Sequence, residues 1–377
     1  MDTLSQQTSP ALPRDNTVAY GNDCHADSSQ DKASEWKFGW LSELRCAMCT
    51  SFTYQTKDGS NALARTMDFT FILNPNAMLI PRGYAWTAIP NNEAHRTRYA
   101  FAGLGRNDEG PLLADGVNER GLSCAALYFP GFAVYKPDPQ TGTVNLAPHE
   151  IVFWMLANFA SVKEVRAALK DVTIVDTPIG FLGITPPLHW MVTDKEGETI
   201  VVEPCSEGLM IYDNPLGVIS NSPDFPWHLT NIRNYIGVNP NQLQPIKLAG
   251  MVFPPFGQGA GTFGLPGDYT PPARFLRVLF GKQTIGHADN EADAVTAMFH
   301  LLFSVDIPKG SVLGKGGMDY TQHSCLMFCD SCSYYFKTYD NNQICRIDLM
   351  AEDRDAKELK IWSIPQEQRI MRINGQA

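Results

Sequence analysis

Cys49 has the sequence surroundings of a reactive nucleophile. It precedes Thr50–Thr56, a β-branched and aromatic run typical of a strand, and the turn signal Asp58-Gly59 leads into a second strand, Asn61–Met67. In the hairpin that this spacing predicts, Cys49 faces the last residue of the second strand, and Arg65 is its diagonal neighbour on the same face. Because an adjacent cation lowers the pKa of a thiol, the pattern predicts a poised nucleophile, provided that a base accepts its proton.

The missing base is supplied if the chain before Cys49 is removed. The cysteine would then carry a free α-amine, whose ordinary pKa near 7.7–8.0 leaves it about half neutral at physiological pH. N-terminal threonine nucleophiles use their own amine in this way. The alternative interpretation is a small buried cysteine without chemistry, which is what most free cysteines are.

Composition excludes several other classes of protein. The chain has 377 residues with a net charge of −10 and a pI of about 5.3, so it lacks the basic stripe that a nucleic-acid partner requires. No apolar run approaches the roughly 18 residues that span a bilayer. Nine cysteines are an odd number in a large chain and do not indicate a disulfide framework, and residues 1–47 lack the pattern of a secretory signal. We therefore expect a soluble, cytoplasmic protein.

The elements that must position Cys49 are predicted to be mainly antiparallel strands. Strand-like runs and hairpin turns outnumber helices, helical patterns occur in two clusters that begin near 149 and 270, and no βαβ alternation is present. This pattern favours an α+β fold in which helices cover antiparallel sheets. We expect a turn at 115–121, a continuous strand at 122–129, and a strand, turn, strand and loop between 188 and 214.

Several blocks of sequence occur in order along nearly all of 49–377: Cys49-Thr50 with Arg65 and Asp68, then Ala114–Glu119, Ser220–Pro223, Gly257–Pro271 and Thr338–Gln343. Together they resemble the choloylglycine hydrolase/penicillin V acylase family of N-terminal nucleophile (Ntn) amidases. The resemblance implies an αββα four-layer sandwich, a single domain over 49–377, and hydrolysis of a linear amide through a thioester acyl-enzyme. It also implies a small-molecule amide substrate, no cofactor or metal, no membrane partner, and a homotetramer.

The resemblance assigns roles to individual positions: the nucleophile Cys49, the flanking cations Arg65 and Arg274, the amine-holding carboxylate Asp68, the oxyanion donors Asn221 (side chain) and Tyr128 (backbone N–H), and the pocket residues Tyr128 and Met67. Arg274 is expected in the first turn of a helix that Thr270 caps and Pro271 begins. Without the resemblance, Arg274 would be interpreted as a surface residue, and Asn221 as part of an Asx-turn.

Tyr128 also bears on the substrate. In this family, bile-salt hydrolases tend to carry Asn at the matching position, and penicillin V acylases tend to carry Tyr. The segments around Arg274, Ile307–Gly310 and Tyr334–Lys337 also resemble the acylases more closely. An aromatic pocket wall suits the aryl face of a phenoxyacetyl group, so the sequence favours a penicillin V acylase-like activity. Conjugated bile-salt hydrolase and N-acyl-homoserine-lactone acylase remain the alternatives among enzymes.

The 48 residues before Cys49 lie outside the resemblance, and family members generally lose only a short leader or a signal peptide. We expect 1–48 to be a leader or propeptide that is removed, with a short amphipathic helix at 35–45. In one interpretation it is a long propeptide that is cleaved autocatalytically. In the other, Met48 is the true initiator and 1–47 is upstream translation. Cys46 offers a competing terminus, but only Cys49 is followed by the matching Thr50.

A second cluster of possible ligands suggests a rival of a different class, a zinc-stabilised non-catalytic binding protein. His323, Cys325, Cys329 and Cys332 are of types that bind zinc. They would straddle one hairpin tip, so we expect core and turn thiols. The glycine-rich loop 257–267 lacks the Gly-Lys-Ser/Thr of a phosphate-binding loop, and no Gly-x-Ser-x-Gly elbow is present.

Overall fold

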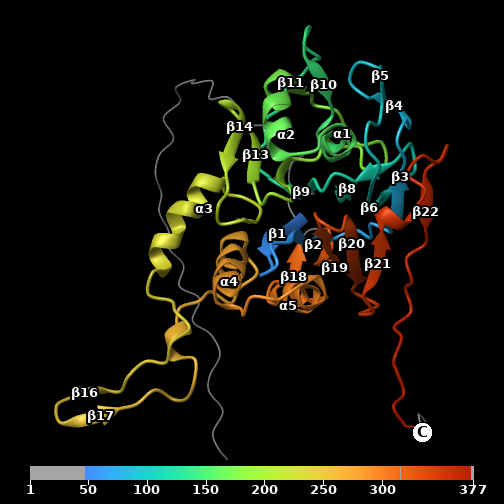
Figure 1. Ribbon diagram of the computed structural model, residues 1–377. Coiled ribbons are helices and arrows are strands. Elements are labelled where there is room, and N and C mark those ends of the chain that lie inside the picture. The colour runs from blue at the N-terminus through green and yellow to red at the C-terminus, as the bar shows by residue number, and fades with distance from the viewer. Residues whose placement is uncertain (1–46, 315, 375–377) are drawn as a thin grey trace, which may run out of the picture. The chain divides into compact units, whose positions relative to one another are not determined.

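The computed structural model describes residues 47–314 and 316–374. These residues form two large antiparallel sheets that face each other, with helices on the outer face of each sheet (Figure 1). The α+β fold with αββα layers that the sequence predicted is therefore confirmed. The predicted helix at 35–45, and the leader apart from its last two residues, lie outside the described residues.

The first sheet contains the hairpin that carries Cys49. The order of its strands is β15, β1, β2, β19, β20 and β21, and β18 pairs with β19. The bounds are β1 (Ala47–Gln55), β2 (Asn61–Phe69), β15 (Val218–Ile219), β18 (Val312–Gly314), β19 (Gly317–Phe328), β20 (Ser333–Thr338) and β21 (Cys345–Asp348). Every residue of β2 is buried, so close packing restricts the movement of the side chains on this strand.

The second sheet faces the first and has the strand order β14, β13, β12, β9, β8, β6, β3 and β22, with β7 paired to β6. Its strands are β3 (Asn76–Ile80), β6 (Phe101–Arg106), β7 (Leu112–Leu113), β8 (Asp115–Asn118), β9 (Ser123–Tyr128), β12 (Leu188–Thr193), β13 (Thr199–Cys205), β14 (Gly208–Asp213) and β22 (Lys360–Trp362). Three small ribbons complete the strands: β4 (Ala85–Ala88) with β5 (Glu93–Arg96), β10 (Val144–Leu146) with β11 (Val172–Ile174), and β16 (Ile246–Leu248) with β17 (Met251–Phe253).

Helices cover the two sheets from opposite sides (Figure 1). The α-helices are α1 (Ile151–Asn158), α2 (Val162–Ala168), α3 (Phe225–Asn231), α4 (Pro271–Thr284) and α5 (Glu291–Phe303), and short 3₁₀ turns are η1 (Pro148–Glu150), η2 (Leu169–Asp171), η3 (Ile232–Tyr235), η4 (Ala260–Thr262) and η5 (Leu349–Ala351). Helices α4 and α5 pack on β1, β2 and β19, whereas α1 packs on β8 and β9. As the sequence predicted, Thr270 is the N-cap residue of α4 and Pro271 is its first residue.

The register of the first hairpin agrees with the prediction. Cys49 pairs with Met67, and Ser51 pairs with Arg65, which makes Arg65 the diagonal neighbour of Cys49. The backbone N–H of Thr56 donates to the carbonyl oxygen of Ser60 at 3.0 Å and closes the loop. Because side chains alternate between the two faces of a strand, the thiol and the guanidinium lie on the same face.

Two local predictions for the second sheet were wrong. The expected turn at 115–121 is a strand over Asp115–Asn118, which pairs with β9, and only 119–121 turns the chain. Gly121 makes this turn with a φ of +83°, and a Cβ there would lie 2.4 Å from the carbonyl oxygen of Cys329. The expected loop before residue 214 is mostly β14, whose partner β13 supplies the backbone hydrogen bonds that an isolated segment lacks.

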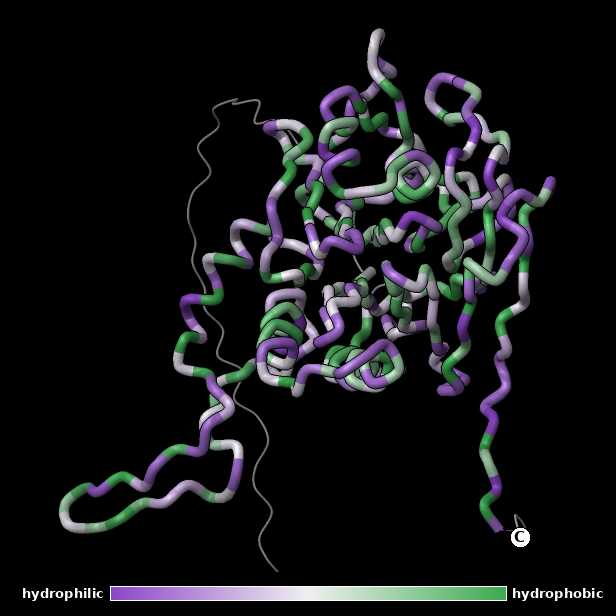
Figure 2. Tube along the Cα trace, in the orientation of Figure 1, coloured by the Kyte–Doolittle hydropathy of each residue, from purple (hydrophilic) through white to green (hydrophobic). Residues whose placement is uncertain are grey.

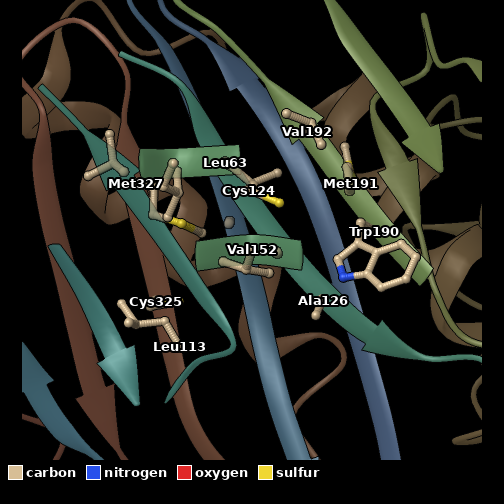
Figure 3. Close-up of a cluster of buried hydrophobic side chains, with 14 of the residues drawn as sticks. Leu63, Leu113, Cys124, Ala126, Val152, Trp190, Met191, Val192, Cys325 and Met327 are labelled. Carbon is tan, nitrogen blue, oxygen red and sulfur yellow. The ribbon is translucent and has the colours of Figure 1, made fainter. Parts of the chain in front are cut away.

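The main core lies where the two sheets and α1 meet. Figure 3 shows Leu63 and Met327 of the first sheet gathered with Cys124 and Trp190 of the second and with Val152 of α1. All five side chains are buried. These buried side chains pack the two sheets and α1 into one closely packed core.

One hairpin of the described chain carries apolar side chains that are exposed to solvent. The hairpin β16–β17 extends away from the two sheets as an arm, and Figure 2 shows apolar residues along it. Its apolar side chains include Ile246, Leu248, Met251, Val252 and Phe253, all of which are exposed. Among the helices that the structure describes, none has the length and apolar character needed to cross a membrane.

Candidate active site

The thiol of Cys49 is buried against the guanidinium of Arg65. Nη2 of Arg65 lies 2.8 Å from Sγ of Cys49, and both side chains are almost completely inaccessible to solvent. Burial raises the pKa of the thiol, because a thiolate loses its hydration, and the positive charge of Arg65 acts in the opposite direction. The structure therefore confirms the predicted position of Arg65 beside the thiol of Cys49.

Arg65 is itself held in place by the second sheet. Its Nη1 lies 3.2 Å from a carboxylate oxygen of Asp115 and donates to the carbonyl oxygen of Ala126 at 2.9 Å. The hydroxyl of Tyr334 donates to the other carboxylate oxygen of Asp115. Sequence reasoning gave no role to Asp115 or Tyr334, although Asp115 lies within the Ala114–Glu119 block that carried the resemblance. The structure shows that this carboxylate is the counterion of Arg65.

Asp68 lies on the opposite face of β2, towards helix α4. Its carboxylate accepts hydrogen bonds from the hydroxyls of Thr66 at 3.1 Å and Thr321 at 2.6 Å, and it lies 3.8 Å from Nη1 of Arg274. Burial raises the pKa of Asp68 to about 6, although Arg274 and the two hydroxyls favour the charged form. In the hairpin, Asp68 pairs with Met48, the residue that precedes Cys49.

Arg274 contacts the backbone of Cys49 and not its thiol. From the first turn of α4, Nη1 donates to the carbonyl oxygen of Cys49 at 2.7 Å, and Nη2 donates to Oδ1 of Asn221 at 2.7 Å. The side chain is fully buried, so its interpretation as a surface residue is wrong. Burial lowers the pKa of Arg274, and the charges of Asp68 and Cys49 oppose that shift.

Asn221 connects Cys49 to both Arg274 and Tyr128. Its Oδ1 accepts from the backbone N–H of Cys49 at 2.7 Å, and its Nδ2 donates to the carbonyl oxygen of Tyr128 at 2.8 Å. The side chain therefore bonds to distant parts of the chain, which the Asx-turn interpretation did not foresee. One N–H of this amide remains for another acceptor, because an NH₂ group has two donors.

The backbone N–H of Tyr128 points to the side of β9 on which Asn221 lies. The next N–H along the chain, that of Phe129 just after β9, donates to the carbonyl oxygen of Pro187 at 2.8 Å. Successive N–H groups of a strand point in opposite directions, so the N–H of Tyr128 points away from Pro187. The carbonyl of Tyr128 points to the side of Asn221, and its N–H points with it. The structure thus brings together the two groups that the resemblance named as oxyanion donors.

A pocket of about 110 Å³ opens beside the thiol. Cys49, Met67 and Tyr128 are among its lining residues, and most of the others are apolar, including Phe69, Leu104, Val152 and Leu188. A second pocket, of about 550 Å³, shares several lining residues with the first, among them Leu112, His149, Ile179 and Phe181. No residue of 137–143, the segment before β10, lines either pocket. An apolar group next to the thiol therefore has room to extend outwards.

The zinc interpretation gains no support from the described residues. Cys329 and Cys332 lie at the tip between β19 and β20, whereas His323 is six residues back along β19, roughly 20 Å for an extended strand. Among residues 47–314 and 316–374, no three His, Cys, Asp or Glu side chains are grouped to hold a metal ion. Cys329 instead lies 3.4 Å from the hydroxyl of Ser123.

Comparisons of the sequence and of the structure with known proteins lead to the same family. A family model described as linear amide C-N hydrolases, choloylglycine hydrolase family, matches residues 49–362. A bile salt hydrolase/transferase of Clostridium perfringens is 38% identical over 329 residues, which are 87% of this chain and 100% of that protein. A crystal structure of conjugated bile acid hydrolase from the same organism has a TM-score of 0.81 at 37% identity, covering 86% of this chain and 100% of the other. A penicillin V acylase of Pectobacterium atrosepticum is 23% identical over 80% of this chain and 81% of its own length.

Proposed function

The chain belongs to the choloylglycine hydrolase family of linear amide C–N hydrolases, and we propose that its substrates are conjugated bile acids. In these molecules an amide bond joins a small amino acid or amino sulfonate to a large apolar acyl group. The observation that carries the proposal is the thiol of Cys49, 2.8 Å from an arginine and lining an apolar pocket. Such a pocket suits the acyl part and leaves the polar leaving group near solvent.

The sequence-based preference for a penicillin V acylase-like activity receives less support than its alternative. The bile salt hydrolase of Clostridium perfringens is 38% identical to this chain, whereas the penicillin V acylase is 23% identical. The preference rested on Tyr128 and on short segments around Arg274, 307–310 and 334–337. Tyr128 is a single aromatic residue in a pocket that many other side chains line. One residue of the pocket wall is a weaker guide to the acyl group than similarity over the whole domain.

The proposed reaction begins with attack of Sγ of Cys49 on the amide carbon. The α-amine of Cys49 accepts the thiol proton and passes it to the leaving nitrogen, the C–N bond breaks, and a thioester remains. Water then attacks the thioester while the same amine accepts one of its protons, and the thiol and the free acid are released. Arg65 stabilises the thiolate, and its charge is permanent near pH 7.

The tetrahedral intermediates need donors for their oxyanion. The free N–H of the Asn221 amide and the backbone N–H of Tyr128 are the two groups assigned here, and each such donor is typically worth roughly 2.7–4 kcal/mol. Arg274 orients Asn221 through the 2.7 Å hydrogen bond to Oδ1. Asp68, which pairs with Met48 in the hairpin, is the carboxylate assigned to the α-amine once the bond before Cys49 is cleaved.

The mechanism requires that residues 1–48 be removed, leaving 49–377 as one Ntn-hydrolase domain. Two observations support this: the family match begins at Cys49, and the backbone nitrogen of Cys49 already lies inside the site, 2.7 Å from Oδ1 of Asn221. Intact-mass measurement of the purified, active protein tests the requirement. A fully active chain that retains Met48 in peptide linkage would refute the free-amine mechanism.

The substrate is tested with a panel of glycocholate, penicillin V and a long-chain N-acyl-homoserine lactone. We expect the largest kcat/KM for glycocholate, and no turnover by Cys49→Ala. A larger kcat/KM for penicillin V would restore the sequence-based preference. The absence of hydrolysis of all three by correctly processed protein would refute the proposed substrate class.

A homotetramer, implied by the resemblance, is also part of the proposal. Its support is the arm β16–β17, because exposed apolar side chains from Ile246 to Phe253 are costly in water unless another surface covers them. A second copy of the chain is the occupant that the resemblance implies.

A further inference from the structure

We propose that Tyr128, His149 and His323 hydrogen-bond to oxygen substituents on the acyl group. By this inference the pocket selects apolar acyl groups that carry hydroxyl or keto oxygens over the corresponding groups without them. The inference rests on the proposed function, in which the pocket beside Cys49 holds the acyl part of the substrate.

His323 lies beside the nucleophile in the sheet. Met67 pairs with Cys49 on one side and with His323 on the other, so the three residues form a row across β1, β2 and β19. Paired residues of adjacent strands point to the same face, and all three line the pocket. The His323 side chain is about 97% buried, since the residue is 3% exposed, and neither ring nitrogen has a hydrogen-bond partner among the described residues.

Two further polar atoms enter the same pocket from other elements. Tyr128 comes from β9 and His149 from the turn η1, and the two residues are only 4% and 8% exposed. Within the part of the chain that the structure describes, the hydroxyl of Tyr128 and Nδ1 of His149 also lack a hydrogen-bond partner. His149 lines both pockets, so it marks the place where they adjoin.

Polar groups without partners in such a site point to a ligand that supplies the partners. Buried polar groups in native proteins are nearly always hydrogen-bonded, because desolvation without compensation is costly. Three such groups from three separate elements line one pocket whose other walls are mostly apolar. An acyl group that is apolar as a whole but bears a few separated oxygens would match this pattern.

The protonation state of the two imidazoles limits which substituents on the acyl group they can bind. Burial lowers the pKa of His323 to about 3, with a further contribution from the charge of Arg65, and burial lowers that of His149 to about 4. Both rings are therefore neutral near pH 7, and each offers one donor and one acceptor. Neutral rings suit hydroxyl or keto oxygens, whereas an anionic substituent would require a cation. The nearby Arg65 is already engaged by Cys49 and Asp115.

The test uses glycine conjugates of one saturated sterol acid that differ only in the number of ring hydroxyls, from none to three. The scissile amide is the same in all of them, so the ratio of kcat/KM between hydroxylated and unhydroxylated conjugates reports recognition of the oxygens. We expect the wild type to prefer the hydroxylated conjugates, and the variants Tyr128→Phe, His149→Phe and His323→Phe each to reduce that ratio, by roughly tenfold per lost hydrogen bond.

The controls separate this inference from the proposed function. His300→Phe makes the same replacement at an exposed position of α5 and should leave both activity and ratio at the wild-type values. Tyr128→Phe removes a single oxygen atom, so it keeps the test valid if a histidine variant fails to fold. Equal kcat/KM values for all conjugates, or a ratio that none of the variants changes, would overturn the inference. If the wild type hydrolyses no conjugate, the proposed function itself fails.

Discussion

Removing the charge of Arg65 should raise the pH at which the thiol of Cys49 reacts. Arg65→Met alone would leave the buried carboxylate of Asp115 without its counterion, and such a loss typically costs roughly 3–5 kcal/mol. The informative change is therefore the double variant Arg65→Met/Asp115→Asn, compared with Asp115→Asn alone. These two proteins differ only in the cation, and neither contains an unpaired buried carboxylate at position 115.

The size of the effect follows from the geometry. Nη2 of Arg65 lies 2.8 Å from Sγ, and the charge is spread over the guanidinium, so the two charges are separated by about 4 Å. At an effective dielectric constant near 20, this separation corresponds to about 4 kcal/mol. Since about 1.4 kcal/mol is a factor of ten in an equilibrium constant, we expect a thiolate population in the double variant that is roughly 1,000-fold smaller than in Asp115→Asn at the same pH.

The assay is the rate at which iodoacetamide alkylates Cys49, followed by mass spectrometry of the peptide that contains it, between pH 6 and pH 11. Each protein is first shown by intact mass to begin at Cys49, so the contribution of the α-amine is common to both. At pH 7 the double variant should react roughly 1,000-fold more slowly. Superimposable pH profiles would show that Arg65 does not set the thiolate population and would refute the electrostatic argument.

Three further predictions concern the nucleophile, its neighbouring carboxylate and the arm. Cys49→Ala should lower the hydrolysis rate by a factor of roughly 10⁶ and abolish the acyl adduct seen by mass spectrometry after acid quenching; retained turnover would place the nucleophile elsewhere. Because the pKa of Asp68 is raised to about 6 while the bond before Cys49 is intact, its ionisation destabilises the folded, uncleaved chain: relative to Cys49→Ala/Asp68→Asn, Cys49→Ala should lose up to about 3 kcal/mol of unfolding free energy between pH 4 and pH 6. Urea unfolding at several pH values measures this difference, and a constant offset would contradict it. Replacing Met251, Val252 and Phe253 by serine should convert the proposed tetramer into smaller species in sedimentation experiments; an unchanged mass would exclude the arm as the assembly surface.

The first hairpin could be predicted from the sequence because its information is local. The Asp58-Gly59 turn and the alternation of strand side chains specify which residues of β1 and β2 face each other. The diagonal placement of Arg65 beside Cys49 follows from these two facts, and the structure agrees with it. Thr270 and Pro271 likewise marked the start of α4.

The structure and role of Asp115 could not be predicted from the local sequence. The stretch from Asp115 to Gly121 has the composition of a turn, but β9 and β6 supply hydrogen-bonding partners on both sides of β8, and this pairing makes Asp115–Asn118 a strand. Its partner Tyr334 is more than 200 positions away in sequence. No local pattern could indicate that the two side chains meet at Arg65.

The sequence by itself determined the pairing of the Cys49 thiol with Arg65 and the family, because these depend on short-range spacing and on ordered motifs. Only the tertiary structure decided that Arg274 contacts the backbone and not the thiol of Cys49, that Asp115 is the counterion of Arg65, and that His323 lines the pocket. The physical reason is that burial and pairing between distant segments depend on how the two sheets and α4 pack together. Packing is a property of the whole chain, and no window of the sequence contains it.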